Sequence, residues 1–440
     1  MTDIAMDNAA PAVPAPPLRH ILAVVSGNAL EFYDFLTYSF FAVYIGEAFF
    51  PAHDAATSLL ASLATFGAGF LTRPIGAMVI GPMGDRIGRK PAMVFTFALM
   101  GIAIIGLALT PSYARIGIVA PIVAILFRLV QGFALGGDVG PTTAYLIEAA
   151  PIAHRGLYTS LQGASQRAAT LVSSMIGTFL ALSLNAQQLA DWGWRVAMLI
   201  GAIIVPFGLV IRRSLPETLH AADDAALAPD ATEGGLSLLG EWRAQLSNIL
   251  FGFAMLASAT ISVYVQNYMT TYGLTTLHMN AVASFGVSCV MSATSVAAAL
   301  AGGAISDRIG RKPVMLGPGF VSLISIVPVF WLITHGGGVA TFYLGLGWLA
   351  FVSGLSMGLA IIVITELLPA RIRSGAMATT YAFAIAIFGG SAQFIVAWLI
   401  GHFHAPMIPA YYWAGATVVG LIAMALVPES APLLKRGNRR

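Results

Sequence analysis

Long apolar stretches recur along the whole chain, separated by short polar segments. An α-helix needs roughly 20 mostly apolar residues to cross a lipid bilayer, and the hydropathy pattern contains twelve stretches of this kind. Their expected limits are 21–45, 58–82, 91–110, 118–147, 157–182, 193–211, 245–270, 282–305, 313–334, 340–365, 377–401 and 408–427. The pattern therefore predicts an all-α integral membrane protein with twelve transmembrane helices.

One long polar segment divides these stretches into two groups of six. We expect an N-terminal six-helix bundle over 21–211, a solvated linker over 212–244 and a C-terminal six-helix bundle over 245–430. Polar tails flank the bundles, one at 1–20 and a basic one at 431–440. The first tail lacks an apolar core of its own, so we expect no cleaved signal peptide.

The composition agrees with a membrane protein and excludes several other classes. Only 9% of the 440 residues are charged, whereas soluble domains carry about a quarter, and 58% are hydrophobic. A net charge of +3 on scattered basic residues excludes a nucleic-acid partner. The single cysteine, Cys289, excludes an intrachain disulfide.

The positions of the basic residues predict an orientation in the membrane. Lys and Arg favour cytoplasmic loops. With both termini in the cytoplasm, most of the 22 Lys and Arg residues lie on the inner side, while Arg115 and Arg195 lie outside. We therefore expect a multi-pass protein of the cell inner membrane with both termini cytoplasmic.

A repeat spans half of the chain. The sequence Asp85-Arg-Ile-Gly-Arg-Lys-Pro91 recurs without change as Asp307-Arg-Ile-Gly-Arg-Lys-Pro313, each time between the second and third stretch of its half. Other markers recur in the same order: Glu148, Pro151 and Arg155 return as Glu366, Pro369 and Arg373, and Pro216-Glu217 returns as Pro428-Glu429. The repeat indicates a duplicated six-helix unit.

The repeated loop, with Gly81 and Gly303 four residues before its Asp, resembles the signature of the major facilitator superfamily, as does Arg128-Leu-Val-Gln-Gly132. Residues 26–35, 69–76 and 192–195 resemble the metabolite:proton symporters within it, and 158–166 with Thr271-Tyr272 are most similar to the citrate/tricarballylate type. The resemblance implies the major facilitator fold, a monomer, and import of a small organic anion with protons by alternating access. Members of the family import citrate, 2-oxoglutarate, shikimate, proline or betaine.

The repeated loops are candidate gates. An acid at such a turn can cap a neighbouring helix N-terminus or bind a nearby arginine. The resemblance implies that the loop latches the two halves together when the central site faces outward. Alternatively, its basic residues only hold the loop in the cytoplasm. The candidate gating residues are Gly81, Asp85, Arg86, Gly88 and Arg89 in the first copy and Asp307, Arg308, Gly310 and Arg311 in the second.

Charged groups inside the predicted spans are candidates for proton coupling, because an ionisable group in hydrocarbon is costly. All of them lie in the N-terminal half. The resemblance implies that Asp34 and Arg128 form a protonation pair, with Glu31 and Asp138 as additional candidates. Structural ion pairs that only join helices are the alternative, above all for Arg73 and Asp138.

The remaining arginines are candidates for binding the anion, since a guanidinium matches a carboxylate in shape. Estimated depths place Arg73 and Arg167 near the membrane centre. Polar neutral groups complete the predicted substrate site: Gln162, Gln166, Tyr264, Asn267, Tyr268 and Gln393, with Ser165, Gln266, Thr271, Tyr272 and Ser391 as further possibilities. Arg167 stands where the citrate type has Gln, which suits a more highly charged or differently spaced anion.

Other functions are less consistent with the sequence. A drug/proton antiporter has a Pro-containing motif in its fifth span, which 157–182 lacks, and uptake of zwitterionic betaine or proline does not call for three membrane arginines. The sequence has no Gly-rich nucleotide loop, metal-ligand cluster or nucleophile–His–acid set. We expect no enzyme activity, cofactor or metal, and as partners only the anion, protons and the lipid bilayer.

Overall fold

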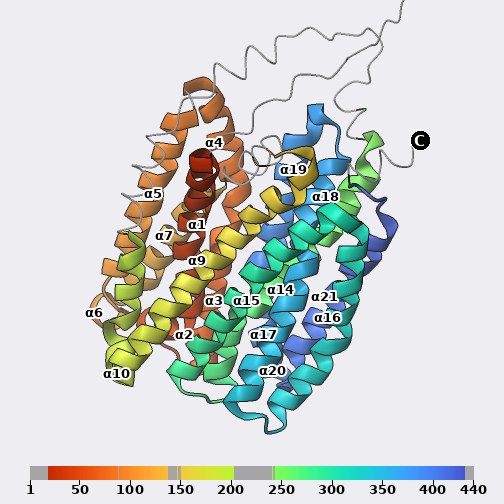
Figure 1. The fold of residues 1–440 in the computed structure, drawn as a ribbon. Coiled ribbons are helices and arrows are strands. Elements are labelled where there is room, and N and C mark those ends of the chain that lie inside the picture. The colour runs from red at the N-terminus through yellow and green to blue at the C-terminus, as the bar shows by residue number, and fades with distance from the viewer. Residues whose placement is uncertain are drawn as a thin grey trace, which may run out of the picture.

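The computed structural model describes residues 18–87, 89–136, 146, 150–202, 240 and 243–431, and the regular elements in these ranges are all helical. The helices run roughly side by side in one elongated bundle. Helices of the N-terminal half of the chain lie on one side and those of the C-terminal half on the other (Figure 1). The two predicted six-helix halves therefore lie next to each other, and the predicted substrate site is expected between them.

The N-terminal half is built from long helices and short helical turns. Their bounds are α1 (Leu18–Phe40), α2 (Ala42–Phe49), α3 (Ala55–Leu71), α4 (Arg73–Ile87), α5 (Arg89–Leu109), α6 (Tyr113–Ile116), α7 (Val119–Leu135), η1 (Ile152–His154), α9 (Arg155–Ser183), α10 (Ala186–Gln188) and η2 (Leu189–Gly193). Residues 194–202 continue as helix.

The C-terminal half has longer uninterrupted helices. Their bounds are α14 (Leu246–Thr275), α15 (Ala281–Ile309), α16 (Arg311–Thr334), α17 (Gly338–Met357), α18 (Ala360–Leu367), α19 (Ala370–Ala384), η3 (Ile385–Gly389), α20 (Gly390–Phe403) and α21 (Ile408–Leu426). The turn η3 is π-helical, a local widening that is frequent at functional sites.

Every predicted apolar stretch coincides with helix in its described residues, but several stretches are interrupted. The stretch 58–82 breaks between α3 and α4 at Thr72, just before the Arg73-Pro74 pair, and 340–365 breaks between α17 and α18 at Gly358 and Leu359. Among the described residues, seven helices are long and apolar enough to cross a membrane. The number of crossings remains a prediction.

Glycines allow the two halves to approach closely along two lines of contact. A Cβ on Gly303 of α15 would lie 2.7 Å from the carbonyl oxygen of Gly156 on α9, and a Cβ on Gly67 of α3 would lie 2.5 Å from that of Gly390 on α20. No side chain fits at such separations. Close backbone contact at α9–α15 and α3–α20 therefore flanks the space between the halves.

A buried ionic cluster joins the halves at the end of the bundle predicted to be cytoplasmic. Asp307 of α15 accepts hydrogen bonds from the backbone N–H groups of Gly156 (2.8 Å) and Leu157 (3.0 Å) at the start of α9. Arg311 is paired with Asp307 at 2.8 Å and with Glu366 at 3.0 Å. Asp307 thus caps a helix of the other half and binds an arginine at the same time.

The second copy of the repeated loop turns at Gly310, whose φ of 103° lies in the region that favours glycine. Beyond this turn Glu429, from the Pro-Glu marker, accepts from the N–H groups of Arg311 and Lys312, both at 2.9 Å. Burial raises the pKa of Glu429, but four backbone N–H donors outweigh it and hold that pKa below its usual value. The repeat markers therefore cap α16 and fix the loop.

Much of the first copy cannot be compared with this arrangement. Gly88 lies outside the described residues. The structure describes helical backbone, but no side-chain environment, at the other candidate gating residues of this copy: Gly81, Asp85, Arg86 and Arg89.

We predict that Asp307→Ala destabilises the protein substantially. The change removes one partner of buried Arg311 and leaves two N–H groups of α9 without their acceptor, and breaking a buried ion pair costs about 3–5 kcal/mol. The expected result is a lower midpoint of thermal unfolding for the purified protein in detergent. Asp191→Ala is the matched control, because Asp191 is exposed and accepts only from Gln187 in the described part of the chain. Equal midpoints for the two variants would show that the contact contributes little.

Candidate functional site

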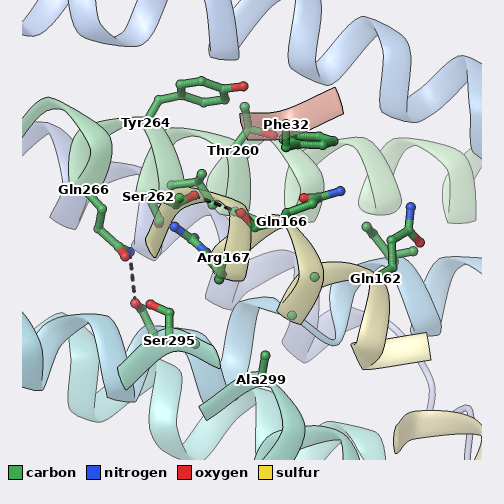
Figure 2. A pocket seen from close by; sticks show the side chains of 18 of the residues that line it. Phe32, Gln162, Gln166, Arg167, Thr260, Ser262, Tyr264, Gln266, Ser295 and Ala299 are labelled. Carbon is green, nitrogen blue, oxygen red and sulfur yellow. Dashed lines mark hydrogen bonds between the residues drawn. The ribbon is translucent and has the colours of Figure 1, made fainter. Parts of the chain in front are cut away.

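A cavity of about 140 Å³ lies between the two halves of the chain. One wall is a face of α9, where the polar lining residues are spaced as on one side of a helix. The opposite wall is α14, and α1, α15, α17, α18, α19 and η3 complete the lining (Figure 2). The lining side chains used below are Gln162, Gln166, Arg167, Tyr264, Gln266, Asn267, Ser295 and Ser353.

Arg167 is the cationic side chain among the described lining residues. It projects from α9 towards the helix that carries Ser262 and Gln266 (Figure 2). No hydrogen bond or ion pair joins Arg167 to any described residue. Because a guanidinium in a low-dielectric site attracts an anion strongly, this side chain makes the cavity suitable for a carboxylate.

A second, smaller space of about 10 Å³, here called the niche, shares Arg167 and other lining residues with the cavity. Arg167, Gln266 and Asn267 line both spaces, and α15 adds Ser288 and Ser292. The niche is about the size of one water molecule. Its walls are mostly polar, so it suits a small polar group adjacent to the guanidinium.

Arg73 does not line this cavity, although the sequence analysis placed it in the substrate site. Its guanidinium carbon lies 4.5 Å from the ring centre of Phe35 and 4.4 Å from that of Phe70. The side chain is 5% exposed. The depth estimate gave its height in the bundle, but not the direction in which it points.

Arg128 lies next to Arg73 in the same aromatic surroundings. Its guanidinium carbon lies 4.3 Å from the centre of the Phe35 ring, on which Arg73 also packs, and its Nη1 donates to Gln131 Oε1 at 2.5 Å. Phe70 in turn packs edge-on against Tyr264, with ring centres 5.5 Å apart. Aromatic rings therefore connect the two buried arginines with the wall of the cavity.

The predicted acidic partners of Arg128 cannot be placed. Asp138 lies outside the described residues. Glu31 and Asp34 are on α1, but their side chains are outside the description. Their part in proton coupling remains a prediction.

Two other predicted substrate residues are also away from the cavity. Gln393 is buried and hydrogen-bonded to Ser39 of α1, whose hydroxyl donates to Gln393 Oε1 over 2.9 Å. Tyr268 is packed in an apolar cluster with Val265 and Met269. Gln393 thus joins the two halves, and Tyr268 belongs to the core of the C-terminal half.

The structure adds lining residues that the sequence analysis did not name. Ser295 of α15 and Ser353 of α17 are buried polar residues in otherwise apolar helices, and Tyr381 of α19 lies on the cavity wall. Polar residues in apolar spans were a usable signal. Serine, however, is common in these helices, and the sequence does not tell which face is turned inward.

The described side chains contain no group of three or more His, Cys, Asp or Glu that could hold a metal ion. What the site offers is a cation, several amides and several hydroxyl groups. This set can bind and orient a polar anion, and it contains no apparent nucleophile and base pair among the lining residues.

Comparison with known proteins agrees with this geometry. The family model "Sugar (and other) transporter" matches residues 20–433. The citrate-proton symporter of Salmonella typhi is 37% identical over 408 residues, covering 92% of this chain and 93% of that protein. The alpha-ketoglutarate permease of Escherichia coli (strain K12) is 32% identical over 427 residues, covering 96% and 95%.

Solved structures identify the same fold. A crystal structure of a D-xylose-proton symporter superposes with a TM-score of 0.75, covering 94% of this chain and 98% of that chain at 18% identity. A structure of a proton:xylose symporter, which superposes with a TM-score of 0.75 at 17% identity, is described as a member of the major facilitator superfamily. The present chain is therefore a membrane transporter, not an enzyme, and it belongs to the sugar (and other) transporter family with the major facilitator fold.

Proposed function

We propose that this transporter imports a small organic anion, a di- or tricarboxylate of the citrate kind, together with protons. The observation that carries the proposal is Arg167, a cation without an ionic partner among the described residues, in a cavity between the two halves. The relatives named as a citrate-proton symporter and an alpha-ketoglutarate permease support the same class of substrate.

The charge of the cavity argues for an anion over other metabolites. Arg167 repels a cationic drug and the quaternary ammonium group of a betaine, and the described lining residues include no carboxylate that would offset this positive charge. Gln162, Gln166 and Asn267 can donate to carboxylate oxygens from the two facing walls. A carboxylate substrate thus uses hydrogen-bond donors on both walls of the site.

Alternating access then follows from where the substrate binds. The cavity walls belong to α9 on one side and α14 on the other, so a bound anion contacts both halves. Binding favours the state in which the halves close around the site. The contacts at α9–α15 and α3–α20 are the surfaces on which the halves rock.

We assign proton coupling to the acidic residues that the sequence predicts as partners of Arg128. Asp34 is the proposed proton carrier, with Glu31 and Asp138 as further candidates. The rings of Phe35, Phe70 and Tyr264 supply a packed connection from Arg128 to the cavity. Release of an acid from Arg128 on protonation would alter that packing, and through it the substrate site.

The membrane location, the oligomeric state and the orientation of the protein are part of the proposed function. It places the transporter in the cell inner membrane as a monomer, with both termini and the linker 212–244 in the cytoplasm. The Asp307 cluster is then a cytoplasmic contact between the bundles 21–211 and 245–430.

We predict that purified protein in liposomes accumulates labelled citrate when the outside is made more acidic than the inside. Proton entry down its gradient drives the anion inward, so a protonophore abolishes accumulation. A screen of other di- and tricarboxylates, betaine and proline defines the substrate class. Accumulation that survives the protonophore would contradict proton coupling, and uptake of betaine or proline without carboxylates would contradict an anion site.

We predict that Arg167→Gln weakens the apparent affinity for the carboxylate on the order of tenfold or more, because a hydrogen bond to a charged group contributes about 1.5–3 kcal/mol. The measurement is the KM of uptake in liposomes. Arg115→Gln is the matched control: Arg115 is exposed on the short helix α6, outside the cavity. If Arg167→Gln transports the same anions with unchanged KM, Arg167 does not bind the substrate.

A further inference from the structure

The amide of Gln266 presents a buried oxygen to the cavity. Gln266 is 4% exposed, and its Nε2 donates to Ser353 Oγ over 3.1 Å. The Ser353 hydroxyl donates in turn to the carbonyl oxygen of Ala350 over 3.4 Å. This chain orients the amide, and Gln266 Oε1 has no hydrogen-bond partner among the described residues.

Nearby amides present hydrogen-bond donors to the cavity, in contrast to the acceptor of Gln266. Asn267 Nδ2 is a buried donor without a partner in the described part of the chain, and Gln166 is a second amide of the lining. Together with Arg167 they form a set of donors, which a carboxylate satisfies. Gln266 Oε1 differs from them, since it can only accept a hydrogen bond. A carboxylate alone leaves it unsatisfied, and an unsatisfied buried acceptor is unfavourable.

The acceptor Gln266 and the cation Arg167 both border the niche. Arg167 and Gln266 both line the main cavity and the niche of about 10 Å³. Figure 2 shows their side chains approaching each other from α9 and α14. The niche admits one water-sized group, which is the size of a hydroxyl. A ligand that carries a hydroxyl on the carbon next to its carboxylate places these two groups side by side.

We propose that Gln266 selects 2-hydroxycarboxylates: the carboxylate binds Arg167, and the adjacent hydroxyl enters the niche and donates to Gln266 Oε1. The proposal rests on the proposed function and assigns the specificity of that site to one residue. An otherwise identical carboxylate without the hydroxyl leaves Oε1 unpaired, so it binds more weakly on the order of tenfold.

The first test uses the unchanged protein in liposomes. Citrate is compared with tricarballylate, and malate with succinate, as competitors of labelled citrate uptake, because the members of each pair differ only in the hydroxyl. We expect the inhibition constant of the hydroxylated member of a transported pair to be lower than that of the other member, on the order of tenfold. Equal constants within each transported pair would overturn the proposal without affecting carboxylate transport.

The second test removes the acceptor. Gln266→Met keeps the length of the side chain but cannot accept the hydrogen bond. The inhibition constants of citrate and tricarballylate therefore become nearly equal. Gln162→Met makes the same chemical change on the opposite wall; it removes a donor to the carboxylate and so weakens citrate and tricarballylate alike, which leaves the ratio of their inhibition constants unchanged. The selection would be assigned to Gln162 instead if Gln162→Met no longer distinguished citrate from tricarballylate while Gln266→Met kept the ratio of their inhibition constants.

The outcomes separate this proposal from the function on which it rests. If no carboxylate is taken up, the proposed function fails and the inference fails with it. If carboxylates are taken up without preference for the hydroxyl, only the role of Gln266 fails. Should Gln266→Met not fold, Ser353→Ala gives the same information, because it removes the hydroxyl that orients the Gln266 amide. A ratio unchanged in Ser353→Ala would then contradict the proposal.

Discussion

A guanidinium inside an apolar bundle is costly, and the structure satisfies this constraint in different ways at different arginines. Arg311 is paired with two carboxylates and joins the loop of the second repeat to α18. Arg73 and Arg128 both pack against the ring of Phe35. Arg167 has neither arrangement among the described residues and lies on the wall of a cavity. Each solution gives its arginine a different role, because a paired charge holds helices together and a charge facing a cavity remains available to a ligand.

The same constraint explains why the halves meet through backbone and glycine. Polar side chains along the contact between the halves would be stripped of water whenever the halves close. Gly156 with Gly303 and Gly67 with Gly390 allow close van der Waals contact with little polar surface. Among the described residues, few polar links join the halves; examples are Asp307 at the start of α9 and Ser39 with Gln393. A contact with few strong links can separate and re-form, as a transporter with alternating access requires.

Much of the fold could be predicted from the sequence, because apolar length and repeated markers are local signals. The role of Asp307 was partly predictable: an acid at a turn caps a helix or binds an arginine, and this one does both. Its partner could not be predicted, since Gly156 is some 150 residues away. For the site, spacing along one helix correctly brought Gln162, Gln166 and Arg167 to one wall. Arg73 was misplaced because height along a bundle does not determine the direction of a side chain.

The aromatic cluster explains how two chemically separate sites can influence each other. Phe35 contacts both buried arginines, Phe70 contacts Phe35 and Tyr264, and Tyr264 forms part of the cavity wall. A Cβ on Gly389, at the end of the π-helical turn η3, would lie 3.0 Å from both the Phe70 and Tyr264 rings. Closely packed rings of this kind cannot be displaced singly. If proton coupling takes place beside Arg128, as proposed, a change of charge there has a packed route to the cavity and to η3, because a shift of Phe35 or Phe70 requires Tyr264 or the turn to move as well.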